Sequence, residues 1–316
     1  MSEPTGYRAA LESAALFETS AHGTLRAVGD DAAVFLHNLS TNDIKKLPAW
    51  EGCEAFFCTA TAKVLGQAWI WREPPRGKKG KEERLWLDLP PGQLPRLLAH
   101  LDRHIVGEDV ALQQENPPRF HLAGPKAGEI LGAAAQPLAF AHPSEGLMIR
   151  RRDLLGVPGF DVLGPLADEL RRRLSAVEGS PEAFHALRVE AGLPWWGHDI
   201  TEETFAPETG RIPAAISYAK GCYLGQEPIV MARDRGMVQR AFVGLETGET
   251  LAPVGASLKR EGKDVGRVTS AAWSPRRGQA VALGYVKRLH SAAGTELAFD
   301  GGTARVAALP LASGTA

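Results

Sequence analysis

The stretch KGCYLGQEPIVMARDRGMVQR, Lys220–Arg240, separates two kinds of sequence. Before it, the chain alternates helical and strand patterns. After it, short apolar segments are separated by clusters of glycine, proline and serine, which is typical of a small all-β sandwich or barrel. The stretch therefore marks where we expect a mixed α+β region to end and a β domain to begin.

Length and composition narrow the class of protein. A chain of 316 residues predicts two or three domains, and its 44% of hydrophobic residues can form large cores. Lys and Arg number 36 against 37 Asp and Glu, so the overall charge does not favour nucleic acid or an acidic membrane. The N-terminus lacks a signal or transit pattern, and no apolar run approaches the roughly 18 residues of a membrane span. We expect a cytoplasmic protein that binds no membrane.

Apolar periodicity and turn residues predict the elements before Lys220. Helices are expected at residues 94–105 and between a Ser180 cap and a Gly192 stop. "QAWIW" and "RLWLDL" predict two strands joined by a solvated basic loop, and the break at residues 113–120 is a candidate domain boundary. Four apolar residues share one face of a further short helix: Ala32, Phe35, Leu36 and Leu39.

Cys222 lies among cations, which lower the pKa of a thiol and favour the reactive thiolate. The alternative is a small buried residue, as free cysteines often are. Cys53 and Cys58, in the apolar "CEAFFC", indicate core positions. The three cysteines have no metal-ligand spacing, so we predict no intrinsic metal site.

Two carboxylates are candidates for a site. Glu190 is expected in the last turn of its helix, the end that favours cations, so an ion pair or a ligand has to offset the mismatch. Asp43, in "STNDI", suits either turn formation or general acid–base chemistry.

Three segments, taken in order and spacing, resemble the YgfZ-type folate-binding proteins, which are relatives of the glycine cleavage T-protein (aminomethyltransferase). The segments are "LRVEAGLPWWGHDI", "AISYAKGCYLGQEPIV" and R-G-x-V-x-R. The most specific part is K-G-C-Y-x-G-Q-E, present from Lys220 to Glu227. The whole resemblance covers about residues 29–286.

The resemblance implies an α+β fold of three lobes around a central folate funnel. Two ferredoxin-like parts, residues 1–117 and 118–236, exchange segments, and residues 237–316 form a C-terminal β-barrel. The implied ligand is tetrahydrofolate or a one-carbon derivative.

The resemblance also assigns roles to single residues. Glu190 falls where the T-protein grips the pterin, Asp43 where it has a catalytic aspartate, and Arg240 where an arginine suits the anionic folate tail. Lys220 and Gln226 of the signature are further folate-binding candidates, with Cys222 as the reactive thiol.

Departures from the T-protein pattern bear on the reaction. The run from Cys222 to Gln226 stands where the T-protein has aspartate, an aromatic residue, any residue, glycine and arginine, and Phe160 stands in place of a tyrosine. These changes argue against aminomethyl transfer from a lipoyl carrier.

The sequence and the resemblance lead to three hypotheses about function. The main hypothesis is a tetrahydrofolate-binding accessory protein that supports iron–sulfur cluster assembly or repair, and through it tRNA modification, with iron–sulfur assembly or client proteins as partners. The alternatives are a folate-dependent aminomethyl or one-carbon transferase and a direct tRNA-binding module. Near-neutral charge argues against the last.

Overall fold

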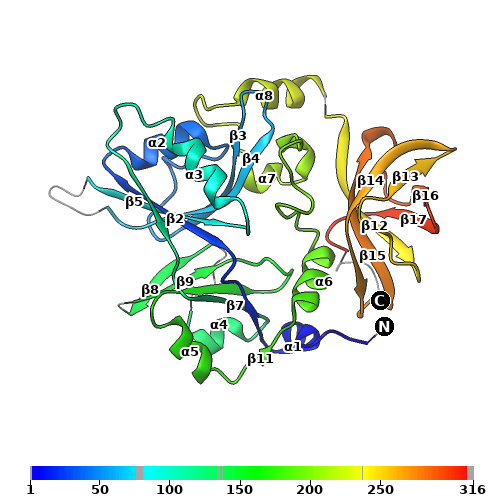
Figure 1. Cartoon of the computed structure of the whole chain (residues 1–316), viewed down its shortest axis with the longest axis horizontal. Coiled ribbons are helices and arrows are strands. Elements are labelled where there is room, and N and C mark those ends of the chain that lie inside the picture. The colour runs from blue at the N-terminus through cyan, green and yellow to red at the C-terminus, as the bar shows by residue number, and fades with distance from the viewer. Residues whose placement is uncertain are drawn as a thin grey trace.

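Two sheets and a closed barrel make up the computed structural model of the chain (Figure 1), and all strand pairs are antiparallel except the parallel pair of β1 (Ala15–Glu18) with β11 (Val177–Glu178) among the described residues. The structure describes residues 2–75, 81–133, 136, 138–144, 146–236 and 238–311. Within these ranges no helix has the length and apolar character needed to cross a membrane. The mixed α+β class with a C-terminal barrel, predicted from the sequence, is confirmed.

The first sheet has the strand order β3-β4-β5-β2-β6 and carries two helices. Its elements are β2 (Gly23–Gly29), α2 (Ala32–Leu39), β3 (Gly52–Cys58), β4 (Val64–Arg72), β5 (Glu83–Leu89), α3 (Leu94–Asp102) and β6 (Ala111–Glu115). The four predicted apolar residues of α2 are all buried, and both predicted strands are present. Helix α3 ends three residues earlier than the apolar pattern predicts, at Asp102. The predicted basic loop includes residues 76–80, which lie outside the described residues.

The second sheet takes strands from both ends of the α+β region, in the order β11-β1-β7-β10-β9-β8. Its strands are β1 (Ala15–Glu18), β7 (Arg119–Ala123), β8 (Phe140–Ser144), β9 (Leu147–Arg151), β10 (Gly159–Leu163) and β11 (Val177–Glu178). Helices α1 (Tyr7–Glu12), α4 (Ala127–Leu131) and α5 (Ala167–Arg173) accompany it. Because β1 pairs with β7, with Ala15 opposite Ala123, the N-terminal segment completes a sheet built mainly from residues beyond 118.

Short helices connect this region to the barrel: α6 (Pro181–Ala191), the 3-10 turn η1 (Ala206–Thr209), α7 (Ile212–Ala215) and α8 (Gln226–Arg235). Helix α6 has the predicted ends, because Ser180 Oγ accepts from Ala183 N at 3.2 Å and Gly192 has φ 70°. Its side chains contact barrel strand β14, while α7 contacts β3. The connecting helices therefore hold the first sheet and the barrel to the rest of the molecule.

The barrel closes in the order β12-β15-β14-β13-β16-β17. Its elements are β12 (Arg240–Gly248), β13 (Ser257–Arg260), β14 (Lys263–Ser274), β15 (Gln279–Lys287), the 3-10 turn η2 (Arg288–His290), β16 (Glu296–Phe299) and β17 (Gly302–Ala307). Val243, Leu245, Leu258 and Val268 are among its core residues. The first barrel strand, β12, begins at Arg240, three residues after the start that the sequence predicts for this domain.

Candidate functional site

The signature loop, residues 220–226, is anchored first by Lys220. This side chain is 6% exposed, and its ammonium donates to the carbonyl oxygens of Ser40 at 2.6 Å, Asn42 at 3.0 Å and His37. Burial lowers the pKa of Lys220 to about 8, and the opposing effects of Asp43 and Cys53 are smaller. The ammonium thus satisfies carbonyls at the C-terminal end of α2, where a positive charge is favourable.

Residues after Cys222 fasten the loop to the first sheet. Tyr223 is buried in an apolar cluster, and Leu224 N donates to Asn38 O at 3.0 Å. Gly225 has φ 84°, and a Cβ at this position would lie 2.5 Å from Thr59 O. Only glycine tolerates both the left-handed conformation and this close approach, so the glycine of the signature has a structural cause.

Cys222 is exposed, whereas Lys220 and Tyr223 of the same loop are buried. Burial raises the pKa of the Cys53 thiol to about 12, and burial also raises the pKa of Cys58. Among the three cysteines, all within the described ranges, Cys222 is exposed, Cys53 half-buried and Cys58 buried. This geometry contradicts the alternative of a small buried residue at Cys222.

Two cations near Cys222 in sequence, Lys220 and Arg233, have other partners. Arg233 pairs with Asp234 at 2.6 Å and lies over the ring of Tyr218, 4.7 Å from its centroid. Gln226 is the first residue of α8 and is partly exposed. The activating role that the sequence assigns to neighbouring cations stays a prediction.

Asp43 lies in the turn after α2, close to the anchor of Lys220. Its Oδ1 accepts from Lys46 N at 3.3 Å and lies 3.3 Å from His37 Nδ1. Burial, and then the charge of Lys220, lower the pKa of His37, so this imidazole is neutral near pH 7. Asp43 therefore has the turn contacts expected of an aspartate here, and its side chain, 17% exposed, is still accessible to a ligand.

Arg240 is far along the chain from these residues and borders a cleft of about 330 Å³ between the barrel and residues 198–204. It pairs with the buried Glu208, with Nη2 2.7 Å from Oε2, and keeps 46% of its side chain exposed. Arg267, His198 and Thr269 also line this cleft. We call it the arginine cleft.

Glu190 lies in a third place, between α1, α6 and the barrel. It is fully buried, accepting from Tyr7 Oη at 2.7 Å and from Arg276 Nε at 2.6 Å. The unfavourable helix end is thus offset by an arginine and a tyrosine of the same chain. A pterin edge would have to replace these donors.

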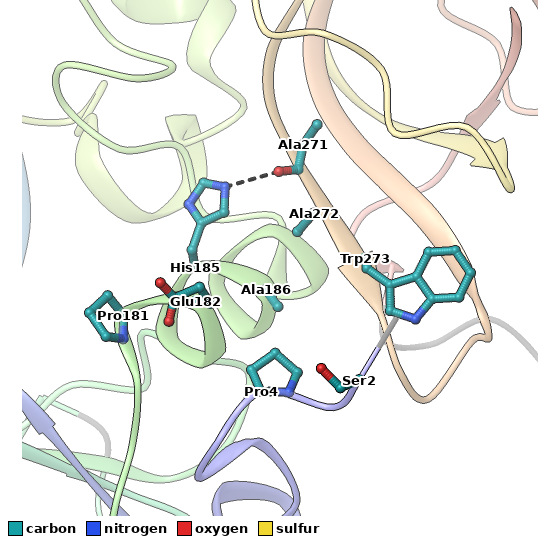
Figure 2. Close-up of a pocket in the computed structure, with 9 residues that line it drawn as sticks. All are labelled: Ser2, Pro4, Pro181, Glu182, His185, Ala186, Ala271, Ala272 and Trp273. Atoms are coloured by element: carbon teal, nitrogen blue, oxygen red, sulfur yellow. Dashed lines mark hydrogen bonds between the residues drawn. The ribbon is translucent and has the colours of Figure 1, made fainter.

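A fourth feature, the open cleft of about 700 Å³ in Figure 2, is lined mainly by apolar groups. It lies between the N-terminal segment, α6 and β14, with Pro4, Pro181 and Trp273 around it (Figure 2). His185 Nε2 donates to Ala271 O at 3.2 Å, which leaves its ring fixed in the wall. None of the six site residues predicted from the sequence lines this cleft.

The six candidates therefore fall into three places. Asp43, Lys220, Cys222 and Gln226 belong to the region of α2 and the start of α8, while Arg240 and Glu190 lie apart from them. The sequence reasoning missed Tyr7, Arg267 and Arg276, which no local motif marks. Within the described ranges, no group of three histidine, cysteine or acidic side chains could hold a metal ion.

Comparison with known proteins places these features in a family context. Residues 240–313 match the family of the glycine cleavage T-protein C-terminal barrel domain. Aminomethyltransferases of Rubrobacter xylanophilus and Symbiobacterium thermophilum are 29% and 27% identical, over 86% and 92% of this chain and 76% and 83% of their own lengths. A chloroplast protein of Arabidopsis thaliana named as a transferase is 26% identical over 86% of this chain and 65% of its own length.

A solved structure shows the same fold. The glycine cleavage system aminomethyltransferase T from Bartonella henselae superposes with a TM-score of 0.85, covering 96% of this chain and 88% of its own, at 24% identity. The T-protein-like architecture expected from the sequence is confirmed. The chain is therefore similar to aminomethyltransferases in sequence and in fold, and its residues 240–313 match the T-protein C-terminal barrel domain.

Proposed function

We propose that this chain binds tetrahydrofolate or a one-carbon derivative and takes part in folate-dependent one-carbon transfer. The observation that carries the proposal is the arginine cleft, where Arg240 and Arg267 line one cavity at the edge of the barrel. The tail of a folate ends in carboxylates, which guanidinium groups bind through paired hydrogen bonds. Similarity to aminomethyltransferases supports the same ligand class.

Arg240 needs no rearrangement to bind such a tail. Its Nε and Nη2 donate to Glu208, and nearly half of the side chain still faces solvent. Glu208 also holds the guanidinium against the ring of Tyr285, 5.5 Å from its centroid. The group is thus preorganised, which lowers the entropy lost on binding.

Glu190 and Asp43 are also assigned roles in this proposal, and a different condition has to be met for each residue to act on the ligand. For Glu190 to grip the pterin, Arg276 has to leave its oxygen, since the pair is buried on the carboxylate side. Asp43 is the candidate acid or base, and Lys220 and Gln226 are candidates for contacts to the ligand. The binding roles of Glu190, Lys220 and Gln226 are tested by the affinity of single variants for the folate. The acid–base role of Asp43 is tested by turnover.

The test is calorimetric titration with tetrahydrofolate and with its methylene and formyl forms. Arg240→Met and Arg267→Met are each expected to weaken binding roughly 10–100-fold, the scale of a hydrogen bond to a charged group. Arg260→Met is the matched control, because Arg260 is an exposed barrel arginine that does not line the cleft. Absence of binding by the wild type, or equal affinity in all variants, would overturn the proposal.

A second function, the accessory role in iron–sulfur cluster assembly or repair of YgfZ-type proteins, is favoured by the exposure of Cys222. Since a single thiol does not ligate a cluster alone, a partner protein has to supply further ligands. In cells, Cys222→Ser should abolish support of iron–sulfur enzymes, and consequently tRNA modification, while Cys53→Ser should not. Full support by Cys222→Ser would remove this function.

The two functions differ in turnover. A transferase releases a folate product with a lipoyl carrier protein in a glycine-cleavage assay, and Asp43→Asn should abolish that turnover. Folate binding without turnover, combined with loss of function in Cys222→Ser cells, would favour the accessory role.

A further inference from the structure

The interface between the two sheets contains a buried charge cluster, distinct from every residue assigned above. It consists of Asp88 on β5, Arg119 and His121 on β7, Arg150 on β9, Arg152 just after β9, and Asp161 on β10. All six side chains are at most 3% exposed. Charges so far from water are costly unless each is paired and hydrogen-bonded.

The two carboxylates are fully used. Asp88 accepts from Arg150 Nη1 at 2.7 Å and from Trp71 Nε1 at 2.8 Å. Asp161 accepts from Arg152 Nε at 2.6 Å and lies 3.1 Å from His121 Nδ1. Each carboxylate thus holds one arginine closely.

The third arginine has no carboxylate of its own. Arg119 Nη1 donates to Thr24 Oγ1 at 3.0 Å and lies 3.4 Å from Asp88, while its Nη2 is 3.8 Å from Asp161. Guanidinium groups stay protonated in proteins, so three positive charges face two negative ones. Another buried carboxylate, Glu73, accepts from Trp86 Nε1 at 2.7 Å and lies 3.2 Å from His142 Nε2. Within the described part of the chain, the cluster therefore has one arginine more than it has carboxylates.

Unused donors show where the excess charge acts. Among the described residues, none accepts a hydrogen bond from Arg152 Nη1 or Nη2, and none from Arg119 Nε or Nη2. Both arginines approach Asp161, with Arg152 Nε 2.6 Å from Oδ2 and Arg119 Nη2 3.8 Å from Oδ1. Arg152 is held over Trp69, 4.5 Å from the ring centroid, which fixes the direction of its free Nη fork.

A cavity lies behind the aromatic rings that pack against the cluster. His22 and Trp195 line a cavity of about 220 Å³ that Phe17 and Phe184 also border. The ring centroid of Trp195 lies 5.9 Å from that of Trp69, the ring under Arg152, and the centroid of Phe184 lies 6.3 Å from that of His121. Glu18 also lines the cavity and pairs with Arg171.

We propose that the sheet interface binds a small monovalent anion, of the size of chloride or formate, through the free donors of Arg152 and Arg119. The anion balances the excess charge and accepts the hydrogen bonds for which the described residues offer no acceptor. A guanidinium fork suits such a ligand, since two parallel N–H groups converge on one acceptor. The site differs from the arginine cleft and does not depend on folate.

The first test measures the thermal midpoint of the whole protein at constant ionic strength. Replacing bulky gluconate by chloride, or by formate, should raise it saturably by roughly 2–4 °C, the shift expected from ligand linkage in a chain of this size class. The two anions distinguish a halide from a carboxylate ligand. No difference among the three salts would overturn the proposal.

Variants localise the effect. Arg152→Met keeps an unbranched side chain over Trp69 and removes the excess charge, so its midpoint should not depend on the anion. Arg151→Met is the matched control, because the neighbouring Arg151 pairs with Asp153 outside the cluster. Anion dependence that survives in Arg152→Met would place the ion elsewhere and refute the assignment.

A crystallographic measurement needs no variant. Crystals of the wild type soaked in bromide should show an anomalous peak within hydrogen-bond distance of Arg152 Nη1 or Nη2. Density at these donors that is explained by water alone, with no anomalous signal, would show that solvent satisfies them and would overturn the proposal even if Arg152→Met fails to fold.

Discussion

Glu190→Gln is the perturbation for which the structure gives the clearest magnitude. The amide oxygen can still accept from Tyr7, whose hydroxyl lies 2.7 Å from the carboxylate. The amide nitrogen, in contrast, places N–H groups against the donors of Arg276. Breaking a buried ion pair from one side costs about 3–5 kcal/mol, but Arg276 is 27% exposed and can regain water. We therefore expect the free energy of unfolding to fall by about 2–3 kcal/mol.

The assay is urea unfolding at pH 7 of the wild type, Glu190→Gln, Arg276→Met and the double variant. The cycle should give a coupling energy of about 1–3 kcal/mol, because the two side chains contact each other directly. Glu178→Gln is the control, since Glu178 is 62% exposed in its pair with Arg171 and should cost less than about 0.5 kcal/mol. A loss in Glu190→Gln no larger than in this control would refute the reasoning.

Tyr7 adds a pH signature to the same cluster. Burial, followed by the hydrogen bond to Glu190, raises the pKa of Tyr7 to about 12, against an unfolded value near 10. A raised pKa contributes stability below the unfolded value, and this stability is lost as the pH rises towards 12. The wild type should therefore lose more stability than Tyr7→Phe between about pH 10 and 12, and parallel curves would contradict the assignment.

Three further outcomes are expected. Mass-spectrometric alkylation of the folded protein at pH 7–9 should modify Cys222 much faster than Cys53 or Cys58, because burial raises the pKa of both other thiols; equal rates would contradict this. In urea unfolding, Lys220→Met should lower the free energy of unfolding by roughly 2–3 kcal/mol, since three carbonyls lose a charged donor. The same variant should accelerate proteolysis of the signature loop. Unchanged stability and unchanged cleavage would count against Lys220 as the anchor of the loop. Arg240→Met should weaken tetrahydrofolate binding without changing the rate of Cys222 alkylation, and a change in that rate would show that the two places communicate.

Much of the fold could be predicted from the sequence because its signals are local. The ends of α6 follow from Ser180 and Gly192, two residues whose side chain or conformation acts within one turn. The barrel follows from strand length and turn spacing. The position of β1 could not be predicted in this way, because Ala15 pairs with Ala123, more than a hundred residues later. The domain boundary predicted between residues 117 and 118 falls between β6 and β7, which belong to different sheets. Strand β1 precedes this boundary in sequence but belongs to the same sheet as β7.

For the candidate site residues, local sequence signals predict even less than they do for the fold. Glu190 is identified by its helix, yet its partners Tyr7 and Arg276 are 183 and 86 residues away and carry no local pattern. Lys220 is two residues from Cys222 in sequence, but its ammonium binds carbonyls of the turn after α2. Proximity along the chain predicts which residues share a loop. It does not predict where a long side chain directs its charge.

The signature loop contains two buried side chains, Lys220 and Tyr223, and the exposed side chain of Cys222. Burial lowers the pKa of Lys220 to about 8, and three carbonyl oxygens accept hydrogen bonds from its ammonium. Gly225 accepts a left-handed conformation against Thr59, and Tyr223 is packed in a core. These features stabilise one loop conformation, and in that conformation the thiol of Cys222 faces solvent. A loop that needed only to pack would gain apolar contact by turning Cys222 inward, as Cys58 does. The exposed thiol is thus the feature of the loop that packing leaves unexplained, which is the reason for assigning it the reactive role.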